Sequence, residues 1–238
     1  MPRANNRPGG VTTNRLLAHL TADERDVLAA KLETVSLSRG TVLYEQGSTV
    51  PSVYFPLSAA VSLLAILEDG ASVEVATVGH EGLVGLAAYL ELDRAAVTAV
   101  VQLPGEALRI GARQFASMVS SRGRFHSVMR RYTRVLLWQI TRSAGCHRFH
   151  SLQQRCAKWL LSAQDHAKKN DLPLTHEFLS SMLGASRQAT GVIIERLERA
   201  RLILASRGTL KILNREGIEL LACECYGAVK NDMDTFLS

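Results

Sequence analysis

The spacing of hydrophobic residues changes several times along the chain, and each change predicts a different kind of element. Residues 15–34 have helical spacing. From residue 35 to about 110, short apolar runs are separated by turn signals, of which the Asp-Gly pair at 69–70 is the strongest. That pattern is typical of an antiparallel sandwich or barrel. Helical spacing returns over residues 112–146 and 151–168, so the chain predicts a β-domain followed by helices.

The segment after these helices predicts two short helices joined by a glycine turn. Thr175 and Ser186 each stand where a hydroxyl can cap a helix, and Gly184 can adopt the left-handed conformation of a tight helix exit. Apolar side chains recur at helical spacing in each helix: Phe178, Leu179, Met182 and Leu183, then Ile193, Ile194 and Leu197. Arg187 and Gln188 begin the second helix, where a helix-turn-helix protein reads the DNA major groove.

Two further features favour DNA binding over the alternative, an ordinary corner between two helices. Apolar runs at 202–205 and 209–213 enclose a Ser-Arg-Gly turn and predict a β-hairpin, or wing, with a basic tip. Between residues 147 and 215, twelve Lys and Arg stand against five Asp and Glu, whereas the whole chain has a formal charge of +6. The positive charge is therefore concentrated in this segment, as attraction to DNA phosphates requires.

A narrow apolar stripe runs along the helix predicted over residues 112–146. Its members are Phe125, Met129, Tyr132, Leu136 and Ile140. A stripe of this width is typical of a seam between two helices, and a helix-turn-helix usually recognises a palindromic site as two copies. We therefore expect these residues to form the seam of a homodimer. The alternative is that the stripe packs on the chain's own β-domain.

A β-rich N-terminal domain, a long helix and a C-terminal winged helix-turn-helix, in this order, resemble the Crp/Fnr family of bacterial transcription regulators. The resemblance covers about residues 15–215 and is most specific over Gly184–Ile203, which is similar to the family's turn and recognition helix. Residues 39–48, with their two glycines, are similar to the opening of a cyclic-nucleotide-binding-like jelly roll. The resemblance implies an α+β fold. Its expected parts are a disordered tail (1–14), a β-domain (15–111), a long connecting or dimerisation helix (112–146), a winged helix-turn-helix domain (147–222) and a C-terminal tail (223–238).

The resemblance also implies roles for single residues. Ser186 would contact a phosphate, Arg187 a guanine edge, and Gln188 a neighbouring base. The remaining residues expected at the DNA are Thr175, Gly191, Arg196 and Arg207. Better-known members have an acid at the place of Gln188 and often a second Arg at that of Val192, so their operator sequence does not carry over. Thr190 stands at an inner position that is more often Val or Ile.

The same comparison locates a candidate effector pocket. In cyclic-nucleotide-binding members a Gly-Glu pair holds the ribose, and an Arg about ten residues later holds the cyclic phosphate. The corresponding residues here are Gly85, Arg94 and Ala95, but Leu86 follows Gly85 where the acid would stand. The motif therefore does not support cyclic-nucleotide binding in the usual way, and the effector, if the β-domain senses one, stays unknown.

The positions of the cysteines bear on metal binding, thiol sensing and nucleophilic catalysis. None precedes Cys146, so the family's N-terminal kind of iron–sulfur cluster is not expected. We interpret two groups as structural rather than metal-binding: Cys146 with His147 and His150, and Cys223 with Cys225. An alternative is a thiol- or metal-responsive regulator that uses Cys146 and Cys156. A remoter one is an enzyme with one of those two thiols as nucleophile and a nearby histidine as base, but nothing in the sequence supplies an oxyanion site.

Composition indicates the cellular location expected for this protein. The 238-residue chain is 47% hydrophobic but has no uninterrupted apolar run of about 18 residues, so no membrane span is expected. Its polar N-terminus lacks the apolar core of a signal peptide. We therefore expect a cytoplasmic protein that is not an enzyme, with double-stranded DNA, a second copy of itself and RNA polymerase as partners.

Overall fold

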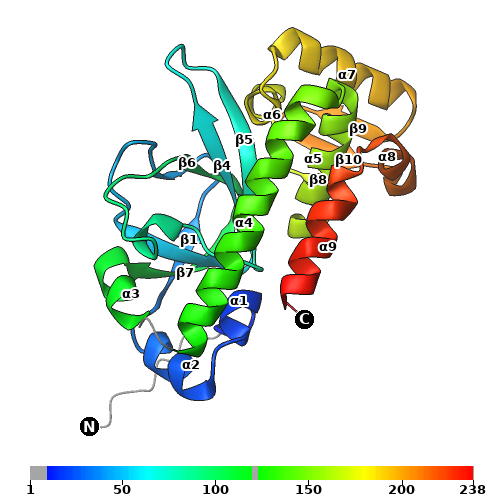
Figure 1. The fold of residues 1–238 in the computed structure, drawn as a ribbon. Coiled ribbons are helices and arrows are strands. Elements are labelled where there is room, and N and C mark those ends of the chain that lie inside the picture. Colours follow the sequence, from blue (N-terminus) through cyan, green and yellow to red (C-terminus); the bar gives the residue numbers. More distant parts are fainter. Residues whose placement is uncertain (1–9, 120–122, 238) are drawn as a thin grey trace. The chain divides into compact units, whose positions relative to one another are not determined.

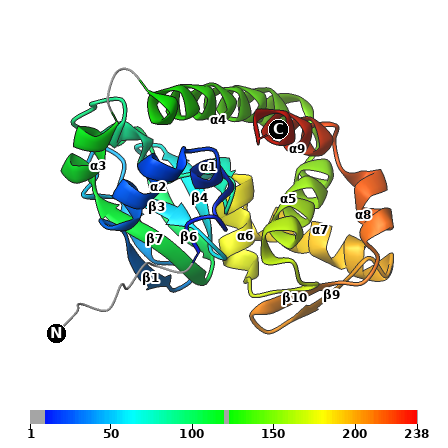
Figure 2. The ribbon, with the colours of Figure 1, turned by 90° about the horizontal axis from the view of Figure 1, so that it is seen from below.

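The computed structural model describes residues 10–119 and 123–237 and divides into two compact units (Figures 1 and 2). The first unit comprises Met1–Val61, Val78–Arg134 and Phe236–Ser238, and the second comprises Ser62–Thr77 and Val135–Thr235. These limits differ from the predicted domains, because residues 62–77 of the β-rich region belong to the C-terminal unit. No helix in the described part of the chain is long and apolar enough to span a membrane.

The first unit starts earlier than predicted. Residues 1–9 of the expected tail lie outside the described residues, but Asn14 is buried and holds the chain in place. Its side-chain amide donates to the carbonyl oxygens of Pro56 at 3.0 Å and Gly82 at 2.9 Å, and its carbonyl accepts from the amide of Leu17. Residues 10–14 are therefore part of the fold, which corrects the prediction of a disordered tail over 1–14.

Two short helices replace the single helix predicted over 15–34. They are α1 (Arg15–Ala18) and α2 (Ala22–Ala29), and strand β1 (Glu33–Leu37) already begins inside the predicted range. The break falls at Thr21, which is extended and forms a capping box with Glu24. A residue in the extended conformation that caps one helix cannot continue the preceding one, so helical spacing alone overestimated the length.

Antiparallel strands form the β-part of the first unit, as predicted. One sheet has the order β1-β7-β3, with β3 at Ser52–Pro56 and β7 at Gly105–Gly111. Strand β2 (Val42–Tyr44) pairs with β6 (Thr98–Leu103), and a short 3-10 helix, η1, covers Leu86–Ala88. The core between these elements contains buried aromatic and aliphatic side chains, among them Phe55, Leu83, Leu108, Ile110 and Phe115.

The long helix predicted over 112–146 is also two helices. Helix α3 spans Ala112–Met118, and α4 spans Arg124–Phe149, three residues beyond the predicted end. Gly123 has a φ of 156°, which is far from the negative φ of an α-helix, and residues 120–122 lie outside the described residues. The predicted connecting helix is therefore α4 alone.

The apolar stripe of α4 is buried within the single chain. The ring of Phe125 stacks edge-on against Phe115 at 5.6 Å between centroids, and the hydroxyl of Tyr132 donates to the carbonyl oxygen of Leu83 at 2.9 Å. Met129 and Leu136 are buried as well. Side chains that the chain itself covers offer little surface to a second copy, so these contacts argue against a seam on these four residues and favour the alternative, that the stripe packs on the chain's own β-domain. Only Ile140 of the stripe is half-exposed.

The second unit combines a hairpin from the β-rich region with the C-terminal elements. Strands β4 (Ala60–Ile66) and β5 (Ser72–Val78) are neighbours, and the turn between them contains the Asp-Gly pair as predicted. The remaining elements are α5 (Leu152–Ala167), β8 (Asp171–Leu172), α6 (His176–Leu183), α7 (Arg187–Arg199), β9 (Ile203–Ser206), β10 (Thr209–Ile212), α8 (Arg215–Leu221) and α9 (Cys225–Leu237). Helix α9 corrects the prediction of a C-terminal tail over 223–238.

Candidate nucleic-acid interface

Two capped helices and a tight turn form the predicted helix-turn-helix. The hydroxyl of Thr175 accepts from the amide of Phe178 and caps α6, and that of Ser186 accepts from the amide of Ala189 and caps α7, both at 3.1 Å. Gly184 ends α6 with a φ of 58°, the left-handed conformation expected there. Hydroxyl caps and a left-handed exit each satisfy backbone groups that a helix end leaves unpaired. The local geometry predicted for this segment is confirmed.

One face of α7 is buried, and this leaves the opposite face outward. Ile193, Ile194 and Leu197 are buried, and so is Thr190, which confirms its inner position. The hydroxyl of Thr190 has no hydrogen-bond partner among the described residues, so this threonine costs stability relative to an apolar residue of the same shape. The outward face carries Ser186, Arg187, Gln188, Val192, Glu195, Arg196 and Arg199, all exposed.

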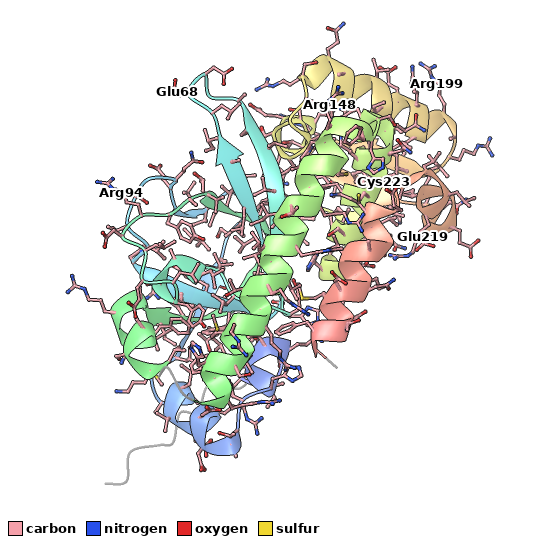
Figure 3. The ribbon with its side chains drawn as sticks, viewed as in Figure 1. Glu68, Arg94, Arg148, Arg199, Glu219 and Cys223 are labelled. Carbon is pink, nitrogen blue, oxygen red and sulfur yellow. The ribbon has the colours of Figure 1, made fainter. Side chains whose placement is uncertain are left out.

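The first outward residue of α7 is held in position by the preceding helix. The guanidinium of Arg187 forms an ion pair with the carboxylate of Glu177 in the first turn of α6. Both side chains are exposed, so the pair contributes little to stability, and its effect is to orient the guanidinium. At the other end of α7, Arg199 pairs with Glu195 at 3.2 Å, and Figure 3 shows its side chain directed away from the helix.

The predicted wing is present and has one strand more than expected. Strands β9 and β10 pair with Ile212 opposite Ile203 and Thr209 opposite Ser206, and exposed Arg207 lies in the turn between them. Strand β10 also pairs with the two-residue β8, giving the order β8-β10-β9. Strand β8 is too short to produce an alternating pattern, which is why the sequence did not reveal it. A sheet of three strands holds the basic tip more firmly than a lone hairpin.

A chain of hydrogen bonds ties the β4–β5 hairpin to the helix-turn-helix within the second unit. Nε2 of His147 lies 3.1 Å from the carbonyl oxygen of Glu74, and its Nδ1 lies 3.0 Å from the Arg155 guanidinium. A carbonyl only accepts and a guanidinium only donates, so the neutral ring with its proton on Nε2 satisfies both. Desolvation lowers the pKa of His147, which favours that form. Arg155 also donates to the carbonyl oxygen of Leu183 at 2.6 Å and so holds the end of α6.

The Glu74 side chain gives this hairpin a dependence on pH. The hydroxyl of Ser62 donates to its carboxyl at 2.5 Å, but the loss of hydration dominates and raises the pKa of Glu74 above its ordinary value of 4.5. Well below pH 4.5 the carboxyl is protonated in both the folded and the unfolded chain, so its contribution to stability is fully present. As the pH rises, the unfolded chain ionises first, and stability is lost until the pH passes the raised pKa.

We therefore expect Glu74→Gln to reduce the loss of stability between pH 4.5 and neutral pH, because a glutamine does not ionise in either state. Urea unfolding of the second unit at a series of pH values measures this. Glu68→Gln, which removes an exposed carboxylate from the same hairpin, is the matched control and leaves the profile unchanged. Parallel profiles for the wild type and Glu74→Gln would contradict this explanation.

The residues of the predicted effector pocket lie in the first unit, and each has contacts within it. The guanidinium of Arg94 donates to the carbonyl oxygen of Gly47 at 2.7 Å, and the amide of Ala95 donates to that of Ser48 at 2.8 Å. Gly85 lies beside β3, and a Cβ there would come to 3.0 Å from the carbonyl oxygen of Ser52. Backbone packing is therefore a sufficient reason for this glycine. The pocket itself remains a prediction.

The burial of Cys156 does not favour the two alternatives that used this residue, the thiol- or metal-responsive regulator and the enzyme with a cysteine nucleophile. Burial raises the pKa of Cys156 to about 12, so it is held as an unreactive thiol. The other three cysteines do not form the two separate groups interpreted from the sequence. Cys146, Cys223 and Cys225 come together with His150 in the second unit. Sequence reasoning missed this cluster because more than seventy residues separate its two halves.

Family models match both parts of the chain. Residues 34–122 match the cyclic nucleotide-binding domain, and residues 154–221 match the Crp-like helix-turn-helix domain. The chain belongs to the Crp/Fnr family. This Crp/Fnr regulator thus has the α+β fold expected from its sequence, a cyclic-nucleotide-binding-like β-region followed by a long helix and a winged helix-turn-helix DNA-binding domain.

Solved structures agree with this assignment at the level of the fold. FixK2 from Bradyrhizobium japonicum is 14% identical, with 81% of this chain and 98% of that chain covered and a TM-score of 0.67. A Crp/Fnr-family transcriptional regulator from Thermus thermophilus is 22% identical, with coverages of 80% and 98% and a TM-score of 0.66. The c-di-GMP responsive global regulator CLP from Xanthomonas campestris is 18% identical, with coverages of 81% and 99% and a TM-score of 0.65. A comparison with curated protein sequences finds no match for this Crp/Fnr regulator.

Proposed function

We propose that this Crp/Fnr regulator acts as a homodimer on a roughly palindromic operator, with α7 in the major groove and the β9–β10 wing on the DNA backbone. The outward face of α7 is the observation that carries the proposal. Its apolar side is buried, while Arg187 and Gln188 project from its capped N-terminus. A helix in this position presents its first side chains to base edges.

Each outward residue has a role that its chemistry supports. The guanidinium of Arg187 can donate two hydrogen bonds to a guanine, and the amide of Gln188 pairs best with an adenine. Ser186 uses its oxygen as an acceptor in the cap, so its hydroxyl hydrogen can be directed to a phosphate. A Cβ on Gly191 would meet nothing within 4 Å, so no internal packing requires this glycine, and we assign it to close approach of the DNA.

The remaining predicted contacts are electrostatic. Arg196 on α7 and Arg207 at the wing tip are exposed cations suited to phosphates. Thr175 is exposed at the N-terminus of α6, where the positive end of the helix dipole also favours a phosphate. These contacts set the orientation of the domain on the duplex, and the base contacts of α7 then select the sequence.

A face of α4 that shares only Ile140 with the predicted stripe supports the dimer. Leu137 is 62% exposed, Ala144 is exposed, and Ile140 between them is half-exposed. Their spacing of three and four residues is that of a two-helix seam. We propose a second copy of this chain as the occupant, because two half-sites of a palindrome need two recognition helices related by a two-fold axis.

The cellular location and the partners of this regulator follow from the same proposal. A protein that binds operators acts where DNA and RNA polymerase are found, so we assign it to the cytoplasm, with RNA polymerase as a further partner and no enzymatic activity. None of the four cysteines forms a disulfide, which fits a reducing compartment. The β-domain either senses an effector or acts without one.

DNA binding by this surface is expected to weaken steeply with salt. Arg196 and Arg207 from each of two copies would neutralise at least four phosphates, so log affinity should fall with log salt concentration with a slope of about −3.6 or steeper. The measurement is fluorescence anisotropy on a duplex selected from a random pool, titrated at several salt concentrations. A slope near zero would contradict phosphate contact, and a selected site without two-fold symmetry would contradict the dimer.

A further inference from the structure

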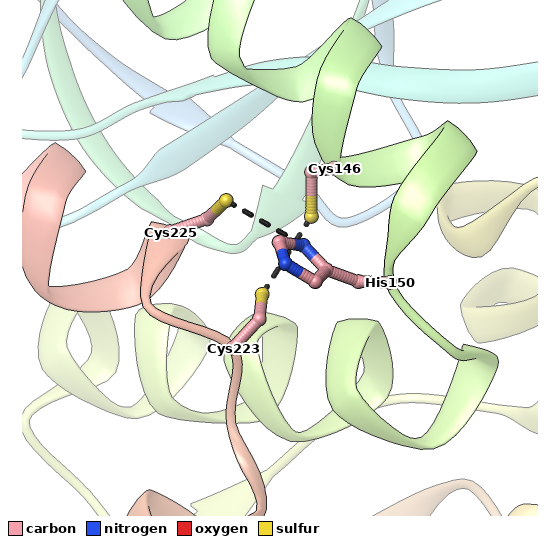
Figure 4. A group of neighbouring side chains, drawn as sticks. All are labelled: Cys146, His150, Cys223 and Cys225. Atoms are coloured by element: carbon pink, nitrogen blue, oxygen red, sulfur yellow. Dashed lines mark hydrogen bonds between the residues drawn. The ribbon is translucent and has the colours of Figure 1, made fainter.

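Three cysteines and one histidine from two distant parts of the sequence meet inside the second unit (Figure 4). Cys146 lies near the end of α4 and His150 just after it, whereas Cys223 and Cys225 lie on either side of the start of α9. One potential ligand atom from each residue lies within 4.8 Å of all the others. The three cysteines are buried.

We infer that Cys146, His150, Cys223 and Cys225 form a tetrahedral site for a single divalent metal ion with the ligand preference of Zn²⁺. Thiolate and imidazole are the ligands that Zn²⁺ takes in closed four-coordinate sites. Such a site leaves no position for water or substrate, so its role is structural: it joins the segment between α8 and α9 to the end of α4.

The distances fit one metal ion better than other ways of using the thiols. Bonds of about 2.3 Å to sulfur and about 2.05 Å to nitrogen place two tetrahedral sulfurs about 3.8 Å apart and a sulfur and a nitrogen about 3.6 Å apart. The sulfurs of Cys146 and Cys223 are 3.6 Å apart, and the sulfur of Cys225 is 3.7 Å from Nδ1 of His150. A disulfide needs about 2.05 Å between its sulfurs. An iron–sulfur cluster spreads its ligands over several iron atoms instead of one.

His150 is oriented as a metal ligand would be. Its Nε2 lies 3.1 Å from a carboxylate oxygen of Glu224, the residue between the two cysteines of the Cys-X-Cys pair. A carboxylate accepts, so it places the ring proton on Nε2 and leaves the Nδ1 lone pair directed at the sulfur of Cys225. Histidine ligands of zinc usually donate their second nitrogen in this way, which fixes the ring and raises its basicity.

The surroundings also separate a metal site from an ordinary apolar contact between cysteines. Buried cysteines often pack as small hydrophobic residues, and three of them could do so here. A histidine ring nitrogen directed at their sulfurs is not part of such packing. The charge balance is favourable as well, because three thiolates and one divalent ion leave a single negative charge.

The test begins with the full-length wild-type chain, purified without a metal-affinity step. We expect one zinc ion per chain by mass spectrometry of the metals, and protection of the three cluster thiols from a thiol reagent until a chelator removes the ion. Replacement by Co²⁺ alone should give the visible absorption of tetrahedral cobalt with thiolate charge-transfer bands. The apo-protein should unfold at a lower temperature, because metal binding to the folded state is stabilising.

Variants distinguish ligands from neighbours. Cys225→Ser and His150→Ala should lose the metal, whereas Cys156→Ala, which removes a buried thiol outside the cluster, should keep one ion per chain. Glu224→Gln should keep the four ligands but weaken zinc affinity by about 10–100-fold in competition with a chromogenic chelator. This milder variant keeps the test decisive if a ligand variant fails to fold.

Several results would overturn the inference. They are a wild-type chain that neither contains nor takes up Zn²⁺ or Co²⁺, a disulfide between Cys146 and Cys223 in freshly purified protein, iron together with sulfide, and equal metal loss in Cys156→Ala. None of these measurements involves DNA, so the metal site and the DNA-binding proposal stand or fall separately.

Discussion

Arg187→Ala abolishes the preference of this regulator for its operator over unrelated DNA. Loss of one bidentate contact to guanine costs about 1–3 kcal/mol, and a homodimer loses it in both half-sites, about 2–6 kcal/mol in all. The affinity for the selected operator should therefore fall by about 30-fold to 10⁴-fold. Binding to random duplex should change much less, since it rests on phosphate contacts. Anisotropy titrations on both duplexes at one salt concentration measure the ratio.

Arg199→Ala is the matched control for this prediction. Arg199 is an exposed arginine on the same helix that also pairs with a glutamate, but it lies at the opposite end from the base-reading residues. Its removal should weaken operator and random DNA together. Both variants should keep the wild-type melting temperature, because exposed ion pairs contribute little to stability. An unchanged ratio of operator to random affinity in Arg187→Ala would exclude Arg187 as a base-reading residue.

Leu137→Asp is expected to convert the protein to monomers. The Leu137 side chain is 62% exposed in the single chain, so the substitution should leave the fold of each monomer intact. In the proposed seam, each copy would bury a carboxylate next to that of its partner, and unpaired buried charge is strongly destabilising. Sedimentation equilibrium measures the mass. Operator affinity should fall at the same time, because each monomer can then hold only one half-site.

Leu220→Asp supplies the control, since it places the same charge at a leucine of α8 that is 88% exposed. That variant should remain dimeric. A duplex with a single half-site separates dimerisation from DNA contact. Leu137→Asp should bind that duplex with the same affinity as one subunit of the wild type. A Leu137→Asp protein that stays dimeric at micromolar concentration would place the dimer seam elsewhere.

Features that depend on close neighbours in the sequence were predictable. A helix cap needs one hydroxyl and an amide three residues away, so Thr175 and Ser186 identified the starts of α6 and α7. A tight helix exit needs a residue that tolerates positive φ, and Gly184 supplied it. The order of β-rich, helical and winged segments was likewise readable, because each has its own hydrophobic period.

Helical spacing was less reliable for the length and the partner of a helix. In the ranges 15–34 and 112–146 the helical spacing persists although the helix itself is interrupted. The interruption lies near Thr21 in the first range and before Gly123 in the second. The stripe from Phe125 to Leu136 was correctly identified as apolar, but it is covered by the chain itself. Periodicity shows that a face is buried and contains no information about which surface buries it.

From the sequence alone we could predict the helix-turn-helix, its caps, the wing and the concentration of positive charge around them, because these features depend on residues a few positions apart. The folded structure was needed to show which side chains of α4 are exposed, that a helix stands in place of the predicted tail, and that Cys146 and His150 meet Cys223 and Cys225. Those outcomes depend on contacts between residues tens of positions apart. The folded backbone sets such distances, and a one-dimensional pattern does not contain them.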